Sequence, residues 1–381
     1  MAAEIKPCLD GVQVLELGSS IAGPSATRHL ADLGATVWKV EPPAGDQLRT
    51  WGTRAPDGSS YWFKGHNRGK RLVSFDVRRA EDAAAVRKLA LDVDIVIENF
   101  RPGWLAQYGL DAKSLRAEKP SLIYLSISGY GQDGPMAAQP GYGAIAESMG
   151  GFRHITGEPD GPPMRMGISI ADELAGLNAS VAALAALHAR DRDGMGETID
   201  ISLVESVFSI LQSVLPEYAH AGKVTKRVGN QLTTAAPSNV YPTSDEQWIA
   251  IAGNGEGIFR RMAAAMGRPE LADDPRYADN YARVANMAEL DVEIARWTKT
   301  LTLVEVEGVL ARAGVPAGPI LSIDAIVAHP QIRAREAVRT LRDEQGIDVT
   351  TYGPVPHLTE RPIQLAPAAG AVGRDQALLS S

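Results

Sequence analysis

The amino-acid sequence predicts an α/β protein with a mainly parallel β-sheet and helices on its faces. The main observation is that short strand-like runs alternate with helical segments along the first two hundred residues. The composition, with 45% hydrophobic and 22% charged residues, is that of an ordinary soluble globular protein. A chain of 381 residues is long for one core, so we expect about two domains.

The chain opens with a strand, a turn, a helix and a second strand, which together form a βαβ unit. Gly34 can take the left-handed conformation that ends a helix, and Pro42 with Pro43 stops the second strand. The four segments are 12–17, 18–24, 25–33 and 36–41, in that order.

The same alternation continues to residue 215 and predicts strands 71–76, 94–98, 122–127 and 197–203, with helices 80–89, 172–188 and 204–215. A polar stretch with Gly222 and Gly229 indicates a linker at 219–234. The second domain is expected to contain strand 247–252 and helices 259–266 and 287–299. The small, polar tail 366–381 is expected to be loosely held.

Charge and composition exclude several classes of function. A net charge of −8 argues against a nucleic-acid surface, because phosphate contacts need an excess of Lys and Arg. The single cysteine, Cys8, excludes internal disulfides, and the scattered histidines lack metal-ligand spacing, so no metal site is predicted. The N-terminus has no apolar signal region and no apolar run is long enough for a membrane span, so a cytoplasmic protein is expected.

Ligands of parallel sheets bind beyond the carboxyl ends of the strands. The candidate segments there are 19–24, 76–79, 99–103 and 128–131. Glu41 falls where a dinucleotide fold places its ribose-binding acid, but the first turn lacks the glycine fingerprint, so a nicotinamide site is a weak alternative.

Asp172 is the strongest candidate for a reactive group. It follows a small, mostly apolar run, opens an Ala-rich helix, and is approached from the turn-rich segment 156–163. A carboxylate in this place is either a nucleophile at the start of a helix or an ordinary N-cap.

Several segments, taken in order from Gly11 to about Arg335, make the chain similar to the class III CoA-transferases, with the α-methylacyl-CoA racemases as near relatives. The segments are 11–17, 22–24, 33–35, 40–42, 67–71, 98–103, 128–135, 166–176, Pro237 with 241–243, and 314–319.

This resemblance implies a large Rossmann-like domain, a smaller α+β domain and an interlocked homodimer. The implied boundaries are 1–218 for the first part of the large domain, 219–234 for the linker, 235–325 for the small domain, and 326–381 for a segment returning to the large domain.

The resemblance also implies that Asp172 attacks an acyl-CoA carbonyl and forms an aspartyl-acyl anhydride, followed by an aspartyl-CoA thioester. Such an anhydride must be kept from bulk water, and amides must stabilise the oxyanion. The loop Gly253, Asn254, Gly255, Glu256 and Gly257 matches the family's mobile loop over the site. Asn254 and Glu256 depart from its glycine pattern, and the alternative is a plain strand-to-helix turn.

CoA esters are expected as substrates, with no permanently bound cofactor. The implied contacts to CoA are Ile21, Ala22, Lys70, Arg71, Asp76, Val77, Arg78, Arg79, Asn99, Phe100, Arg101 and Tyr142. Alternatively, Lys70, Arg78 and Arg79 form a solvated basic face. Pro42 and Gln107 stand where formyl-CoA transferase has arginines that contact CoA, so the grip on the phosphates must differ here.

Tyr142 separates the two enzyme classes. It stands where the racemases have a histidine, and a phenol, which ordinarily ionises near pH ~10, is a poor proton-transfer partner. The first hypothesis is therefore a CoA-transferase acting on an acyl-CoA and a small carboxylic acid. An acyl-CoA racemase or isomerase is the second hypothesis, and a non-catalytic acyl-CoA-binding protein is the third.

Overall fold

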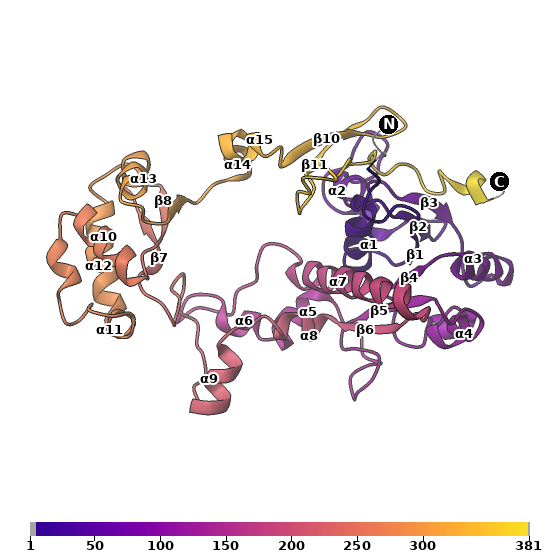
Figure 1. Cartoon of the computed structure of the whole chain (residues 1–381), viewed down its shortest axis with the longest axis horizontal. Helices are drawn as coiled ribbons and strands as arrows, with labels where there is room; N and C mark the ends of the chain where they lie inside the picture. The colour runs from indigo at the N-terminus through magenta and orange to yellow at the C-terminus, as the bar shows by residue number, and fades with distance from the viewer. Residues whose placement is uncertain (1–4, 380–381) are drawn as a thin grey trace. The chain divides into compact units, whose positions relative to one another are not determined.

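The computed structural model describes residues 5–379, which form two units (Figure 1). The first unit comprises the chain up to Phe152, Met166–Glu217 and the chain from Pro330 onward. The second comprises Arg153–Arg165 and Tyr218–His329. From the sequence, residues 153–165 were expected in the large domain and the linker was expected to begin at residue 219. The loop 153–165 has no regular pattern that ties it to either unit.

A six-stranded sheet with the order β3-β2-β1-β4-β5-β6 forms the centre of the first unit. Every neighbouring pair is parallel, which confirms the predicted fold class. The strands are β1 (Gln13–Leu17), β2 (Thr36–Glu41), β3 (Arg71–Ser74), β4 (Ile95–Glu98), β5 (Ile123–Ser128) and β6 (Thr198–Ser202). The strand order reverses between β1 and β4, and a crevice at such a point is the usual ligand site of an open parallel sheet.

The helices of the first unit are α1 (Ala22–Asp32), α2 (Tyr61–His66), α3 (Ala80–Asp92), α4 (Ala112–Glu118), α5 (Gly143–Met149), α7 (Ile170–Asp193), α8 (Leu203–Phe208), the first residues of α9 (Val214–Ala221) and α15 (Pro330–Ala334). The short α6 (Phe152–Ile155) begins where the first unit gives way to the second. Short 3₁₀ turns are η1 (Gln47–Thr50), η2 (Leu105–Tyr108) and η4 (Gln376–Leu379).

Two expected helix boundaries were wrong. Helix α1 begins at Ala22, inside the expected turn, because Pro24 falls in its first turn, where a missing N–H costs no hydrogen bond. The single helix expected at 204–215 is interrupted between α8 and α9, where Gln212 takes a left-handed backbone conformation (φ 52°) and Leu211 is buried.

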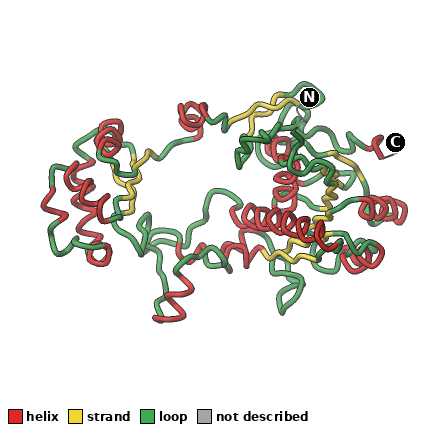
Figure 2. Tube along the Cα trace, viewed as in Figure 1, coloured by secondary structure: helices red, strands yellow, loops and turns green. Residues whose placement is uncertain are grey.

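Helices cover both faces of the parallel sheet (Figures 1 and 2). On one face Val14 and Ile97 pack with Leu30 of α1 and Ala179 of α7. On the other face neighbouring strand residues such as Leu15 pack with the helices α3 and α4. This alternation follows from the two-residue period of a strand.

Helix α7, with 24 residues, is the central helix of the first unit and packs on α1. By length and composition alone it could cross a membrane, but Ala171, Ala175, Ala179 and Ala183 are fully buried within the first unit. Small residues on this face allow the two helix backbones to approach closely.

The C-terminal segment contradicts the expectation of a loosely held tail as far as residue 379. Ala368 and Ala369 are fully buried. The side chain of Asp375 accepts a hydrogen bond from the Leu72 amide at 2.7 Å, and that of Gln376 accepts one from the Ser74 amide at 2.8 Å. Small residues are favoured here because the segment must fit against β3 and α2. The preceding hairpin, β10 (Val338–Arg342) and β11 (Asp348–Tyr352), also packs on α2.

The second unit is a smaller α+β body. Its antiparallel sheet has the order β7 (Ser238–Pro242), β8 (Trp248–Ala252), β9 (Ala317–Pro319). Its helices include α10 (Glu256–Ala265), α11 (Asn280–Ala285), α12 (Met287–Thr298), α13 (Leu303–Arg312) and α14 (Ile323–Ala328), with a 3₁₀ turn η3 (Pro269–Ala272). Its core contains Tyr241, Ile249, Met262 and Leu290.

Candidate active site

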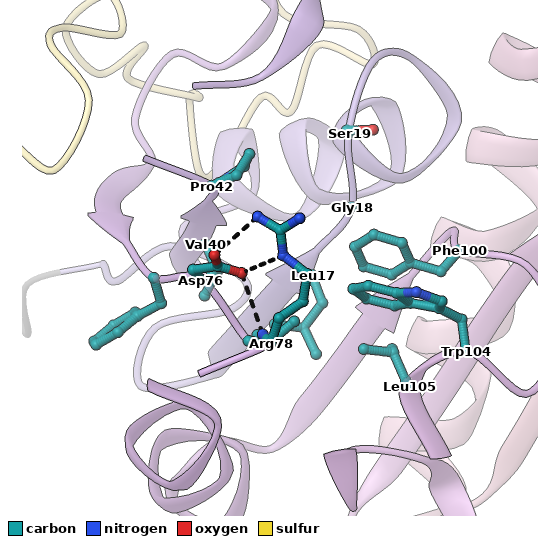
Figure 3. A pocket seen from close by; sticks show the side chains of 12 residues that line it. Leu17, Gly18, Ser19, Val40, Pro42, Asp76, Arg78, Phe100, Trp104 and Leu105 are labelled. Atoms are coloured by element: carbon teal, nitrogen blue, oxygen red, sulfur yellow. Dashed lines mark hydrogen bonds and ion pairs between the residues drawn. The ribbon is translucent and has the colours of Figure 1, made fainter. Parts of the chain in front are cut away.

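A pocket of about 310 Å³ opens at the carboxyl ends of β1 to β4 (Figure 3). This is the crevice where the strand order reverses. Four residues predicted from the sequence, Asp76, Val77, Arg78 and Phe100, lie in its wall. The full lining is Leu17, Gly18, Ser19, Val40, Pro42, Phe75, Asp76, Val77, Arg78, Phe100, Trp104 and Leu105.

An aromatic stack forms one side of the pocket. The rings of Phe100 and Trp104 lie 4.4 Å apart at 26°, and Tyr108 meets Trp104 edge-on at 5.0 Å. Flat aromatic faces bind planar heterocycles by stacking. The sequence reading missed Trp104, although the spacing of four between the three aromatic residues places them on one face of a helical turn.

Arg78 and Asp76 supply the charge in the pocket. Nε and Nη2 of Arg78 donate to the two Asp76 carboxylate oxygens at 2.7 and 2.8 Å (Figure 3). The hydrogen bond from Arg78 lowers the pKa of the Asp76 carboxyl, so this side chain is ionised at neutral pH. Arg79 is not part of the lining and instead pairs with Glu81.

Asn99 connects the aromatic loop to the turn between β1 and α1. Its Oδ1 accepts from the Ser19 amide at 2.9 Å, and its Nδ2 donates to the Ser19 carbonyl at 2.9 Å. Glu98 holds the same loop, because its carboxylate accepts from the Phe100 amide at 2.7 Å. Burial raises the pKa of Glu98 to about 7. Arg101 follows on the exposed side of the loop.

A network of buried charges holds the turn between β1 and α1. Ser20, whose φ of 65° is strained for a residue other than glycine, has its amide held by the Asp46 carboxylate at 3.0 Å. Lys39 bridges Asp46 and Glu16 with contacts of 2.8 and 2.6 Å. The turn that leads into Ile21 and Ala22 is therefore held in one conformation.

Lys70 belongs to this network, which corrects its expected contact with a CoA phosphate. Its ammonium lies 2.8 Å from Glu16 and donates to Asn67 and to the Pro24 carbonyl, and the side chain is fully buried. Arg71 is exposed and lies over the Trp38 ring, 4.8 Å from its centroid. Both residues stand where β3 begins, whereas the pocket lies where β3 ends.

Glu41 is buried and cannot hold a ribose. Its carboxylate is paired with Arg49 at 2.7 Å. The distance from the first turn suggested a ribose-binding acid, but spacing along the chain does not show which way a strand side chain points. The nicotinamide alternative is wrong on this point.

Asp172 lies in the first turn of α7, two residues after the helix begins. The N-cap position belongs to Ser169, so the reading of Asp172 as an ordinary N-cap was wrong. The Asp172 carboxylate lies against Gly143, the residue that follows Tyr142. One turn further along α7, Gly176 packs against the Ala22 carbonyl and Ser25 of α1.

The first unit places Asp172 against Gly143, the residue that follows the predicted site residue Tyr142. Gly176, four residues after Asp172, packs against the Ala22 carbonyl. Tyr142, the residue before Gly143, is exposed. Ser19, at the edge of the pocket, leads along the chain to Ile21 and Ala22. The β1–α1 turn therefore runs from the edge of the pocket to Ala22, which packs against Gly176 of α7.

The loop Gly253 to Gly257 lies in the second unit and joins β8 to α10. The buried Arg283 holds it, donating to the Asn254 carbonyl at 2.8 Å and to the Glu256 carboxylate at 2.9 Å. Glu256, one of the two departures from the glycine pattern, thus makes a specific contact, and Asn254 makes its contact through the backbone. The role of the loop as a lid stays a prediction.

Comparisons with known proteins identify the family of the chain. The chain is 44% identical over 355 residues to the succinyl-CoA–D-citramalate CoA-transferase of Chloroflexus aurantiacus, covering 93% of this chain and 88% of that protein. It is 40% identical over 383 residues to the succinate–glutarate CoA-transferase of Agrobacterium fabrum, covering 98% of this chain and 94% of that one. A solved CaiB/BaiF family protein from Brucella suis is similar with a TM-score of 0.86 at 38% identity, covering 99% of both chains.

The family model for CoA-transferase family III matches residues 9–376, nearly the whole described chain. Together with the identity to these relatives, this match shows that the protein belongs to CoA-transferase family III.

Proposed function

We propose that the protein transfers CoA from an acyl-CoA donor to a carboxylic acid through covalent intermediates on Asp172. The observation that carries this proposal is a single carboxylate in the first turn of α7, packed against Gly143, in the same unit as the pocket at the switch point of the sheet. A carboxylate nucleophile divides one difficult exchange into easier steps.

The proposed steps balance without any added proton or electron. A carboxylate oxygen of Asp172 attacks the thioester carbonyl, the C–O bond forms, and the C–S bond breaks to give a mixed anhydride and CoA thiolate. The thiolate then attacks the aspartyl carbonyl, which releases the donor carboxylate and leaves an aspartyl-CoA thioester. The acceptor carboxylate attacks this thioester, and the returning thiolate attacks the acceptor carbonyl, which frees Asp172 and the new acyl-CoA.

For the substrates we propose succinyl-CoA as donor and a short dicarboxylic acid as acceptor. The support comes from the relatives, whose names specify succinyl-CoA with D-citramalate and succinate with glutarate. The racemase alternative requires a proton-transfer base on each face of the α-carbon. The resemblance puts Tyr142 at the position where the racemases have a histidine, so that second base is missing from this proposal.

A substrate panel tests this assignment. Incubation with succinyl-CoA and either glutarate, citramalate or malate is expected to give the new CoA ester, and to do so faster than with monocarboxylates of matched length. Separation of the CoA esters by chromatography with mass detection measures the product. A rearranged or inverted acyl-CoA without transfer would favour a racemase, and no product with any acid would favour a binding protein.

The pocket suggests how CoA is bound. The adenine would stack on Phe100 and Trp104, and Arg78 would leave Asp76 to pair with a phosphate, which makes stronger charge-assisted hydrogen bonds. Asp76 would then be free to accept from a ribose hydroxyl. Arg79, Lys70 and Arg71 have no part in this arrangement.

Arg78→Ala is expected to raise KM for succinyl-CoA by roughly 10-fold or more, because one charge-assisted contact is lost. The matched control is Arg79→Ala, since Arg79 is similarly exposed but pairs with Glu81 outside the pocket. Steady-state kinetics with succinyl-CoA and with succinyl-pantetheine, which lacks the nucleotide, measure both effects. Equal losses with the two donors would show general damage and contradict the phosphate contact.

We further propose a homodimer. The face of α7 opposite its buried alanines exposes Leu177, Val181 and Leu184, which share one side of the helix because they are spaced by four and three residues. Such a stripe on a central helix is typical of a surface that another chain covers. The resemblance to the family implies that this chain is a second copy.

A further inference from the structure

The Asp172 carboxylate occupies the space beside Gly143 that a side chain would take. A Cβ atom at Gly143 would lie 2.0 Å from Oδ2, 2.9 Å from Cγ and 3.5 Å from Oδ1 of Asp172. Ordinary contact begins near 3.4 Å, so the carboxylate and a methyl group cannot both fit there. Gly143 has an ordinary backbone conformation, so the need for glycine here is one of space alone.

The chain that carries Gly143 is fixed by a second glycine contact. Gly141 crosses Gly129 so closely that a Cβ on either would lie 2.6 Å from the other's Cα. Gly129 follows β5, and its carbonyl accepts a hydrogen bond from the Val204 amide at 3.2 Å. Gly143 therefore cannot easily move away from Asp172.

The helix that carries Asp172 is fixed as well. A Cβ on Gly176 would lie 2.8 Å from the Ser25 Cβ and 3.1 Å from the Ala22 carbonyl, so the first turns of α7 lie directly on α1. Asp172 and Gly176 share one helix face because they are four residues apart. With both backbones held, an added group at Gly143 can be accommodated only by turning the carboxylate.

We propose that Gly143 is a positioning residue for the covalent step: its missing side chain leaves the space that holds the Asp172 carboxylate in line with the thioester carbonyl. This inference rests on the proposed function of Asp172. A nucleophile works when it lies about 3–3.5 Å from its target in the correct direction, and a displacement of about 1 Å can cost roughly 100-fold in rate. A methyl group at Gly143 would force a displacement of at least that size.

The first arm of the test is kinetic. Gly143→Ala is expected to lower kcat by roughly 100-fold while KM for succinyl-CoA stays within about twofold, because the pocket that binds the nucleotide is untouched. Gly167→Ala is the matched control, since it lies on the same approach to α7 and has no neighbour within 4 Å of its added Cβ. Transfer by Gly143→Ala at the rate of Gly167→Ala would overturn the inference.

The second arm measures the contact itself and does not depend on catalysis. Gly143→Ala is expected to lower the Tm of the wild-type protein, but to leave it unchanged or raise it in an Asp172→Ala background. The reason is that the clash is then gone, and alanine is the better helix residue. An equal fall of Tm in both backgrounds would show that the carboxylate is not what the methyl group meets, and would overturn the inference.

The two arms separate this inference from the proposed function. If Asp172→Ala itself kept full transfer, the covalent mechanism would be wrong, and with it the positioning role, even if the Tm comparison confirmed the contact. If Asp172→Ala were inactive and Gly143→Ala fully active, only the inference about Gly143 would be wrong.

Discussion

Asp172→Asn is expected to lower the rate of CoA transfer by roughly 10³-fold or more, because an amide oxygen is a poor nucleophile and the covalent route is lost. The fold should remain, since the side chain lies in the first turn of α7, and the interaction of its charge with the helix dipole contributes only about 0.3–1 kcal/mol to stability. Transfer between succinyl-CoA and glutarate, together with thermal melting, measures the two effects.

Asp191→Asn is the matched control, because it removes a carboxylate from the exposed end of the same helix and should leave transfer unchanged. Trapping with hydroxylamine after addition of succinyl-CoA should mark Asp172 in the wild-type protein and mark nothing in Asp172→Asn. A folded Asp172→Asn protein with transfer near the wild-type rate would rule out the covalent mechanism.

Glu16→Gln is expected to destabilise the protein by about 3–5 kcal/mol, since it takes the buried counter-charge from Lys70 and leaves Lys39 with Asp46. Glu16 contacts Lys39 at 2.6 Å and Lys70 at 2.8 Å, and all three side chains are fully buried. Chemical denaturation at pH 7 measures the free energy of unfolding. A change below ~1 kcal/mol would mean that the network tolerates the loss by releasing one lysine to water.

The exposed pair of Lys6 and Asp10 provides the control, and Asp10→Asn should have little effect because water already solvates both groups. The dependence on pH follows from the sign of the shift at Glu16. Burial alone would raise the pKa of its carboxyl, but the charges of Lys39 and Lys70 outweigh burial and lower it. The stability that ionised Glu16 contributes is therefore present at neutral pH and lost only as acid protonates it, below its ordinary pKa.

The strands of the first unit could be predicted because a buried parallel strand is a short apolar run bounded by turn residues, which local sequence shows. Thr36–Glu41 was predicted residue for residue, since an apolar run is bounded there by Gly34 and by prolines. The end of α1 was predicted for the same reason. The C-terminal segment was not, because its small residues look like a free tail until β3 and α2 are in place beside them.

Some residues of the candidate site could likewise be predicted from the sequence, and others could not. Asp172 and the loops after the strands could be identified from order and resemblance, since parallel strands bring their carboxyl ends to one edge. Lys70 and Arg71 could not be assigned from charge, because charge shows neither that Lys70 is buried nor that Arg71 lies over Trp38 at the other end of β3 from the pocket. The contact between Gly143 and Asp172 joins residues far apart in the chain, and no local pattern records it.

The contacts of Asp375 and Gln376 with β3 bear on how the chain folds during synthesis. The strand β3 is one of the two outer strands of the sheet, and its Leu72 and Ser74 amides donate to side chains that lie 303 and 302 residues further along the chain. Until those residues leave the ribosome, the nascent sheet presents an open edge of the kind that pairs with other chains. Translation must therefore pass Asp375 and Gln376 before this edge of the sheet is protected from aggregation.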